Sequence, residues 1–220
     1  MEPILNNIEL RILGALIEKE ITTPVYYPLT LNALTNACNQ KNNRDPIVEF
    51  DDTTVARGLE SLRDKSLVSY ITSPGYRVPK YKHNFATFNH LSHQETVILC
   101  ILMLRGPQTP GELRNRSGSM HNFESIEAIE EVMNALAAHV PPLVRLLQRG
   151  AGQKEARYTH LLSGEPTPAE IAHTLKPEKA VIQIQTENER ISRLEEQFKQ
   201  LLKENEELKK QLAEFRKQFD

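Results

Sequence analysis

A polar run between two predicted helices carries side chains that can contact nucleic acid. Residues 39–44 read Asn-Gln-Lys-Asn-Asn-Arg and join a predicted helix over residues 31–39 to one that opens at residue 51 or 52. Asn and Gln can pair with adenine, and Arg and Lys with guanine or phosphate. The same amides can instead cap helix ends and satisfy backbone groups, so both interpretations remain open. The candidate DNA contacts in this run are Asn39, Gln40, Lys41, Asn42 and Arg44.

The helix that follows this run offers a second set of contacts. Its polar face includes Arg57, and in a helix-turn-helix the corresponding helix lies in the major groove. Asp51 and Asp52 stand at its start, where carboxylates also suit the positive end of the helix dipole. The equivalent helix later in the chain is acidic, with Glu124, Glu127, Glu130 and Glu131. Phosphates repel such a face, so we do not expect this second helix to read DNA.

A predicted hairpin follows each of these helices and adds basic residues. In the first hairpin, strand alternation places Lys80 and Lys82 on one face and Tyr81 on the other, with Arg77 near the turn. Such cations commonly hold the DNA backbone and add affinity without sequence information. A charged strand edge that prevents aggregation has the same pattern and stays an alternative. The second hairpin carries Arg145, Arg149, Lys154 and Arg157.

A third basic group lies in residues 104–116. Arg105, Arg114 and Arg116 can cluster at the N-terminus of a short helix, where backbone N–H groups also attract anions. This arrangement would suit a phosphate-bearing or acidic small ligand. The alternative is structural, with the arginines pairing with Glu112 and its neighbours.

Patterns typical of enzymes and metal sites are absent from the sequence. It has no G-x-S-x-G, P-loop, H-E-x-x-H or glycine-rich dinucleotide turn, its seven His are scattered, and no C-x-x-C occurs. We therefore expect no enzyme activity, no cofactor and no metal. Cys38 and Cys100 fall in apolar helical stretches, which favours buried thiols. Because the longest apolar run, residues 97–104, is too short to cross a bilayer and the start lacks a signal segment, we expect a cytoplasmic protein.

Helix caps, apolar spacing and strand-like pairs occur twice in the same order. A shift of 86 residues superposes Glu9 on Glu95, Leu13 on Leu99 and Leu16 on Leu102. In each half a Thr-Pro step, two more helices and a hairpin follow. The predicted strand pairs are residues 67–72 with 78–83 and residues 143–148 with 156–161.

Three helices followed by a hairpin with a basic edge is the order of a winged helix-turn-helix. Because this order occurs twice, the sequence predicts a tandem. The fold class is mainly α with small sheets (α+β), as two winged helix-turn-helix domains over residues 1–88 and 89–163.

Two stretches of the chain resemble the signature segments of a known family. They are Ala-Cys-Asn-Gln-Lys-Asn-Asn-Arg-Asp-Pro at residues 37–46 and Leu-Arg-Gly-Pro-Gln-Thr-Pro-Gly-Glu-Leu-Arg-Asn-Arg at residues 104–116. Over residues 5–165 the chain is similar to the YceH family of bacterial proteins. The resemblance implies a tandem winged-helix fold and a dimer. It implies no biochemical activity, catalytic residue or cofactor.

The C-terminal part has the spacing of a coiled coil. After a Pro-containing linker over residues 164–178, apolar residues recur at alternating steps of three and four in the segment 179–220. Asn205 stands at an a position of the heptads, where such a residue typically fixes register and favours two parallel strands. A lone amphipathic helix folded back on the body is the alternative. The predicted dimer contacts are Ile191, Leu194, Phe198, Leu201, Asn205, Leu208, Leu212 and Phe215.

Charge and organisation together favour a DNA-binding regulator. The 27 Lys+Arg and 29 Asp+Glu give a formal net charge of −2, which excludes a generic polycation but not a local basic face. We expect a cytoplasmic homodimer that binds double-stranded DNA through its first winged helix and hairpin. The alternative is a winged-helix adaptor that docks another protein without binding DNA. A regulator that senses a small ligand is a third possibility, resting on Arg105, Arg114 and Arg116.

The heptads predict a parallel homodimer in solution. In parallel strands Arg190 faces Glu195 and Glu204 faces Lys209, and both pairs attract. Sedimentation or light scattering at micromolar concentration should therefore give twice the 25.1 kDa mass of the chain. A monomer whose coil is still helical would contradict this prediction.

Overall fold

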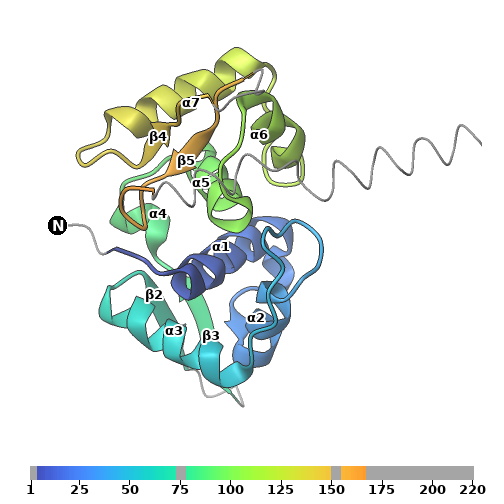
Figure 1. Cartoon of the computed structure of the whole chain (residues 1–220). Coiled ribbons are helices and arrows are strands. Elements are labelled where there is room, and N and C mark those ends of the chain that lie inside the picture. Colours follow the sequence, from blue (N-terminus) through green and yellow to red (C-terminus); the bar gives the residue numbers. More distant parts are fainter. Residues whose placement is uncertain (1–3, 73–77, 150–154, 167–220) are drawn as a thin grey trace, which may run out of the picture. The chain divides into compact units, whose positions relative to one another are not determined.

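The computed structural model describes residues 4–72, 78–149 and 155–166 (Figure 1). Helices make up about half of this part, and its strands form two small antiparallel sheets, which confirms the predicted α+β class. No helix within these ranges is long and apolar enough to cross a membrane. The winged-helix assignment stays a prediction. The coiled coil does too, because the segment 179–220, with all the predicted dimer contacts, lies outside the described residues.

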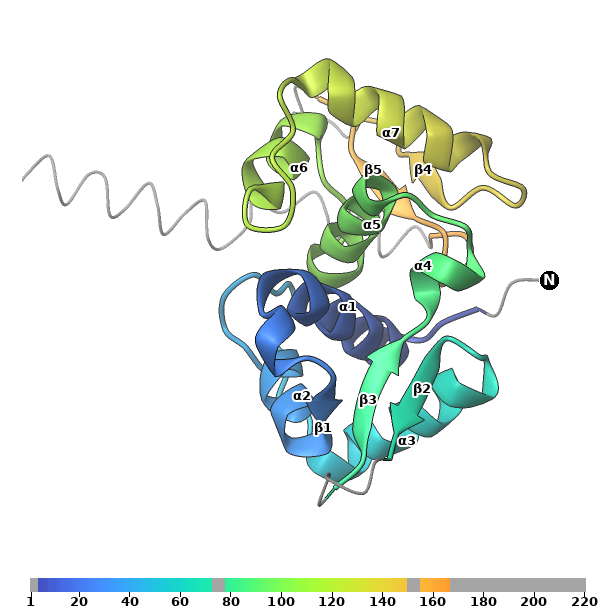
Figure 2. The ribbon, with the colours of Figure 1, turned by 180° about the vertical axis from the view of Figure 1, so that it is seen from behind.

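The first half combines three α-helices with a three-stranded sheet, whose arrangement can be followed in Figure 2. In chain order its elements are α1 (Asn7–Thr22), the 3₁₀ turn η1 (Pro24–Tyr26), β1 (Leu29–Thr30), α2 (Leu31–Cys38), α3 (Asp52–Asp64), β2 (Val68–Ile71) and β3 (Lys80–His83). β3 is the central strand and pairs antiparallel with β1 and β2, so that Tyr81 lies opposite both Leu29 and Tyr70.

The second half repeats the order of helices and hairpin. After the short connecting helix α4 (Phe85–Phe88), its elements are α5 (His93–Arg105), α6 (Pro110–Ser117), α7 (Ile126–Ala138), β4 (Val144–Leu146) and β5 (Tyr158–His160). β4 pairs antiparallel with β5. Gln108, which precedes α6 as β1 precedes α2, forms an isolated bridge to Tyr158 and so takes the place of a third strand.

The helices begin at caps that the sequence already shows. Complete capping boxes open α1, α5 and α6, formed by Asn6 with Glu9, Ser92 with Glu95, and Thr109 with Glu112. Single side-chain caps open α2, α3 and α7, from Thr30, Asp51 and Ser125. α5 ends at Gly106, whose φ of +70° is a conformation that favours glycine.

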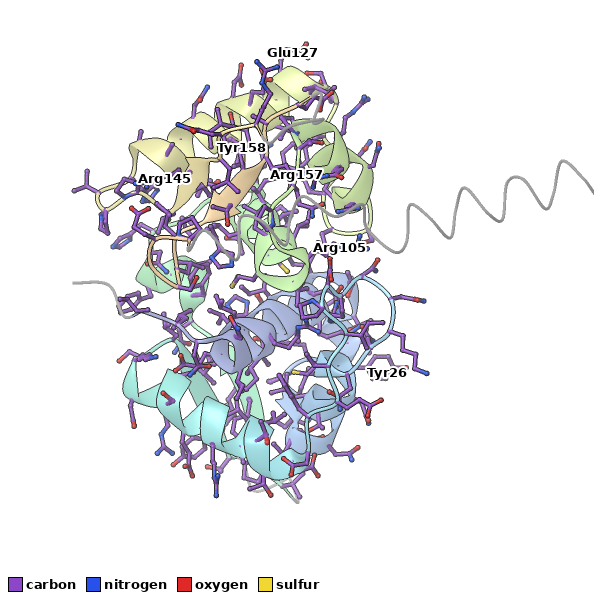
Figure 3. The ribbon with its side chains drawn as sticks, viewed as in Figure 1. Tyr26, Arg105, Glu127, Arg145, Arg157 and Tyr158 are labelled. Carbon is purple, nitrogen blue, oxygen red and sulfur yellow. The ribbon has the colours of Figure 1, made fainter. Side chains whose placement is uncertain are left out.

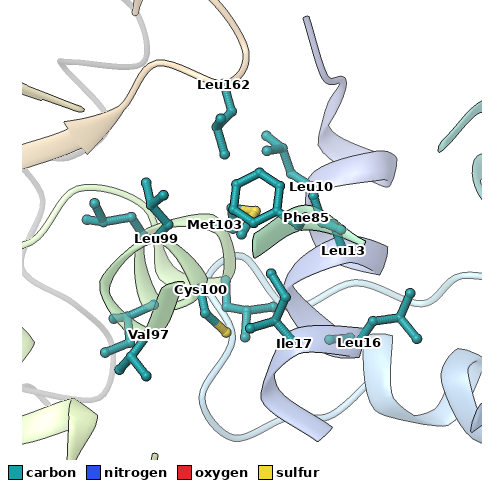
Figure 4. Packing of buried hydrophobic residues seen from close by; sticks show 14 of the residues in the cluster. Leu10, Leu13, Leu16, Ile17, Phe85, Val97, Leu99, Cys100, Met103 and Leu162 are labelled. Carbon is teal, nitrogen blue, oxygen red and sulfur yellow. The ribbon is translucent and has the colours of Figure 1, made fainter. Parts of the chain in front are cut away.

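One continuous hydrophobic core joins the two halves, with α1 and α5 packed together inside it (Figure 4). α5 is buried at every residue from 96 to 104, so its apolar run faces protein on all sides. The two helices approach closely at Gly14, whose carbonyl oxygen accepts a hydrogen bond from the Cys100 thiol at 3.3 Å. Burial raises the pKa of this thiol, and the nearby Glu18 carboxylate raises it further. Both cysteines are buried, as predicted.

The substitution Gly14→Ala tests this contact. Ala favours a helix interior over Gly by about 1 kcal/mol. The added methyl group, however, would lie 2.9 Å from the buried Leu104 side chain, and overpacking a core costs about 1–3 kcal/mol. Because the two effects oppose each other, we expect urea denaturation to show a net loss of up to about 2 kcal/mol in the free energy of unfolding.

Gly111→Ala in α6 is the matched control for this substitution. Only the Thr109 hydroxyl lies near the added methyl, at 3.9 Å, so stability should be unchanged or slightly higher. Equal losses for the two variants would contradict the tight crossing of α1 with α5.

Candidate nucleic-acid interface

α3 exposes the face that the sequence assigns to DNA. Thr53 and Arg57 are exposed, and Arg57 forms no ion pair with another described residue. Asp51 caps the helix, accepting a hydrogen bond from the backbone N–H of Thr54 at 2.7 Å. Hydrogen bonds from the Thr54 hydroxyl and N–H lower the pKa of the Asp51 carboxyl, which keeps a negative charge at the start of α3.

A cleft of about 210 Å³ separates α3 from the β2–β3 hairpin. Tyr70 and Tyr81 are directly opposed on neighbouring strands, and the guanidinium of Arg63 lies 5.8 Å from the centre of the Tyr70 ring. The hairpin therefore presents aromatic rings to α3. The cleft is lined by Ala56, Leu59, Glu60, Arg63, Val68, Ser69, Tyr70, Pro79 and Tyr81.

The predicted hairpin lysines do not line this cleft. Lys82 is exposed and lies opposite Ser69, while Lys80 is half-buried. Since Tyr81 between them does line it, the two lysines belong to the other face of the strand, as alternation predicts. Arg77 lies outside the described residues.

A buried histidine connects this hairpin to the end of α1. His83 Nε2 lies 2.6 Å from Glu20 Oε2, and the backbone N–H of His83 donates to the Tyr27 hydroxyl at 2.8 Å. The hydrogen bond from His83 lowers the pKa of the Glu20 carboxyl, and the charge of Lys82 lowers it too. Glu20 thus holds a negative charge that reduces the positive potential around Lys82.

Arg44 is buried, not presented to a partner. Its side chain has no accessible surface, and its two terminal nitrogens donate to the two oxygens of Glu18, at 2.6 and 3.1 Å. Further bonds reach the carbonyl oxygen of Ala37 at 2.9 Å and the Gln40 side chain at 3.2 Å. The prediction that Arg44 contacts DNA is therefore corrected, because this guanidinium cannot reach a base or phosphate.

Two further side chains hold the loop between α2 and α3 from within. The amide of Asn39 exchanges two hydrogen bonds with the backbone of Phe50, at 2.7 and 2.8 Å. Arg11 is buried in α1 and donates to the carbonyl oxygens of Cys38, at 3.2 Å, and Pro46, at 2.6 Å. Asn39 thus satisfies backbone groups as the alternative interpretation describes, whereas the Gln40 amide accepts its hydrogen bond from the Arg44 side chain.

The tip of this loop contacts α5. The Arg105 guanidinium donates to the Asn43 side chain, and Figure 3 shows Arg105 at the end of α5 beside the loop. The backbone N–H of Asp45 donates to the carbonyl oxygen of Leu104 at 2.9 Å. The two stretches that resemble the YceH signatures therefore meet in space. Lys41, Asn42 and Asn43 are exposed at this tip.

The three arginines predicted to form an anion site are not gathered at the N-terminus of α6. Arg105 contacts Asn43, and Arg114 donates to the carbonyl oxygen of Glu124 at 3.0 Å. Arg114 and Arg116 belong to the last turn of α6, at the opposite end from its capping box. The prediction of a joint site is corrected accordingly, since the helix separates these residues from its own N-terminus.

Basic residues of the second half are also paired within it. The Arg157 guanidinium binds both oxygens of Glu112, at 2.7 and 2.8 Å, and Arg145 pairs with Glu165. Sequence patterns gave no sign of these pairs, whose members are 45 and 20 residues apart. α7 keeps an exposed acidic face, with Glu127, Glu130 and Glu131. Within the described ranges no three His, Cys, Asp or Glu side chains are placed to hold a metal ion.

Comparison with known proteins identifies the family. A family model described as "Protein of unknown function, DUF480" matches residues 5–153, which cover most of both halves and both resembling stretches but end before β5. The chain belongs to the DUF480 family. It is 50% identical to a UPF0502 protein of Geotalea uraniireducens and 48% identical to one of Geobacter sulfurreducens, each over 220 residues and the whole of both chains. A UPF0502 protein of Opitutus terrae is 55% identical over 174 residues, 76% of each chain.

Membership of DUF480 is consistent with the resemblance found in the sequence. The names of these relatives state no ligand, substrate or activity. The function of this DUF480 protein is therefore inferred from the geometry of its surfaces.

Replacing Arg44 tests its structural role in this DUF480 chain. Arg44→Ala leaves the Glu18 carboxylate buried without its partner, and breaking a buried pair in this way costs about 3–5 kcal/mol. Arg44→Lys keeps the charge but loses the two-pronged contact, so its loss should be smaller. Urea denaturation measures both. Lys41→Ala on the same loop is the control and should change stability by less than about 0.5 kcal/mol; equal losses at residues 44 and 41 would refute the buried role.

Proposed function

We propose that this DUF480 protein is a cytoplasmic, homodimeric DNA-binding protein, a transcriptional regulator that applies α3 and the β2–β3 hairpin to double-stranded DNA. The order of its elements supports an interpretation of each half as a winged helix. In that arrangement the third helix enters the major groove and the hairpin holds the backbone. A dimer would present two copies of α3 to half-sites about 34–36 Å apart.

The observation that carries this proposal is the exposed guanidinium of Arg57 on α3. Among the described candidate arginines, Arg44, Arg105 and Arg114 are committed to contacts inside the protein. Arg57 remains at the surface, and an exposed Arg can bind guanine or phosphate in two-pronged fashion. Lys82 supplies a second exposed cation on the adjoining hairpin.

The second half is expected to take no part in reading DNA. The exposed face of α7 is acidic and would be repelled by phosphates. Two basic residues of the following hairpin, Arg157 and Arg145, are paired with Glu112 and Glu165. We therefore assign DNA contact to the first half alone.

Docking of another protein is the second candidate function. The cleft between α3 and the hairpin has aromatic walls, and Val25 and Tyr26 of η1 are 89% and 75% exposed. Figure 3 shows Tyr26 at the surface of the first half. Neighbouring exposed apolar side chains are typical of protein contact sites. This candidate requires no DNA affinity, which separates it from the first.

Fluorescence anisotropy with mixed genomic DNA fragments tests the proposal. We expect binding at low salt. The logarithm of the binding constant should fall linearly with the logarithm of the salt concentration, and each lost phosphate contact should reduce this slope by about 0.9. Arg57→Ala combined with Lys82→Ala should therefore reduce the slope by about two. Arg145→Ala in the second half removes an exposed cation away from α3 and should leave the slope unchanged.

Two outcomes would count against DNA binding by the first half. An unchanged slope in the double variant would remove α3 and the hairpin from the interface. No binding below about 100 μM, the weak end of non-specific affinity, would reject DNA binding and favour protein docking.

A further inference from the structure

A polar groove of about 440 Å³ lies where the loop between α2 and α3 approaches the second half. The end of α1 and the loop tip supply most of its walls, and Ser119, which follows α6, closes it from the second half. This volume is within the range of small-molecule sites, about 300–1,000 Å³. The groove is lined by Glu18, Lys19, Thr22, Gln40, Lys41, Asn42, Asn43 and Ser119.

The charges of this groove are unbalanced toward the positive. Glu18 is its acidic residue, and the two-pronged bond from the buried Arg44 already neutralises that carboxylate. Lys19 lies 3.7 Å from the same carboxylate, as a second cation on one acid. Lys41 is exposed and forms no ion pair within the part of the chain that the structure describes. Two positive charges are therefore left in excess, and they attract anions.

The groove is also held in a fixed shape. Arg44, Arg11 and Asn39 tie the loop to α1, α2 and the start of α3 from inside. Arg105 ties its tip to α5. Asn43 holds a φ of +60°, a left-handed turn conformation that Asn adopts more readily than most other residues besides glycine. Side chains on a loop held in this way are positioned before a ligand arrives, which reduces the entropy cost of binding.

The remaining lining groups are neutral hydrogen-bonding side chains. Ser119 contributes a hydroxyl and Asn42 an amide, both of which can donate to oxygen acceptors, whereas the Thr22 hydroxyl already donates to the carbonyl oxygen of Glu18 at 2.7 Å. Donors of this kind beside lysines suit the oxygens of phosphate or carboxylate groups.

We propose that this groove binds a small polyanionic molecule that carries phosphate or carboxylate groups, held between Lys19 and Lys41 with Ser119 at its far side. The site is separate from α3 and the hairpin, so it goes beyond the proposed DNA contact. The polar run that the sequence singled out for DNA thus serves two purposes. Its buried members hold the loop, and its exposed members face the ligand.

Calorimetric titration of the full chain with inorganic pyrophosphate and with citrate tests the site. We expect saturable binding of at least one probe with a Kd below about 1 mM at low salt. Pyrophosphate alone would identify phosphate as the preferred group, and citrate alone would identify carboxylate. Lys19→Ala combined with Lys41→Ala should weaken binding about tenfold or more.

Two matched variants separate a built groove from general charge attraction. Arg145→Ala combined with Arg149→Ala removes the same number of cations outside the groove and should leave the Kd within about twofold. Ser119→Tyr keeps every charge but fills the groove from its second-half side, and it should weaken binding as the lysine pair does.

Three results would overturn the proposal. One is no saturable binding of either probe up to about 10 mM. Another is that the double lysine variant and the double arginine variant weaken probe binding equally. The third is that the variant with Lys19→Ala and Lys41→Ala still binds the probe but no longer binds DNA, which would make the groove part of a nucleic-acid surface. Because DNA anisotropy is measured separately, failure of the groove and failure of DNA binding by α3 are distinguishable.

Discussion

Packing of α1 against α5 sets the position of the other elements in both halves. Each of these helices opens its own half, and the two share one continuous core. α2, α3 and the first sheet are built outward from α1, as α6, α7 and the second sheet are from α5. Cores are close-packed, so a contact as tight as the one at Gly14 couples the stability of the two halves. The surface on α3 and the groove beside the loop therefore belong to one packed unit.

Buried charge decides how the loop between α2 and α3 divides its polar side chains. Arg44 turns inward because Glu18 and the carbonyl oxygen of Ala37 need a donor there. A guanidinium has five N–H donors, enough to satisfy a carboxylate and several carbonyls at once. Lys41 and Asn42, which have no such partners, remain outside. One short run thus combines interior anchors with exposed groups.

Local features of the fold could be predicted from the sequence, because caps and turns depend on neighbouring residues. Asn6 with Glu9 and Ser92 with Glu95 mark the starts of α1 and α5, and the strand pairs lie within the predicted ranges. The inward orientation of Arg44 could not, since its partner Glu18 is 26 residues away. The packing of the two halves against each other, in contrast, had a signal in the sequence. A helix that is apolar on every side, as α5 is, must be covered by protein on every side.

The contacts between α1 and α5 also have a reciprocal pattern. Gly14 faces Leu104, and Glu18 faces Cys100; the 86-residue shift converts each pair into the other. Gly14 also accepts the hydrogen bond from Cys100, the residue to which the 86-residue shift converts it. Reciprocity of this kind is the mark of a twofold axis, as in a symmetric dimer. The two halves thus pack across an interface that resembles that of a dimer. Because they are not identical, the third helix of the second half, α7, can be acidic, whereas the third helix of the first half, α3, carries Arg57. Two such chains would assemble four modules, not two.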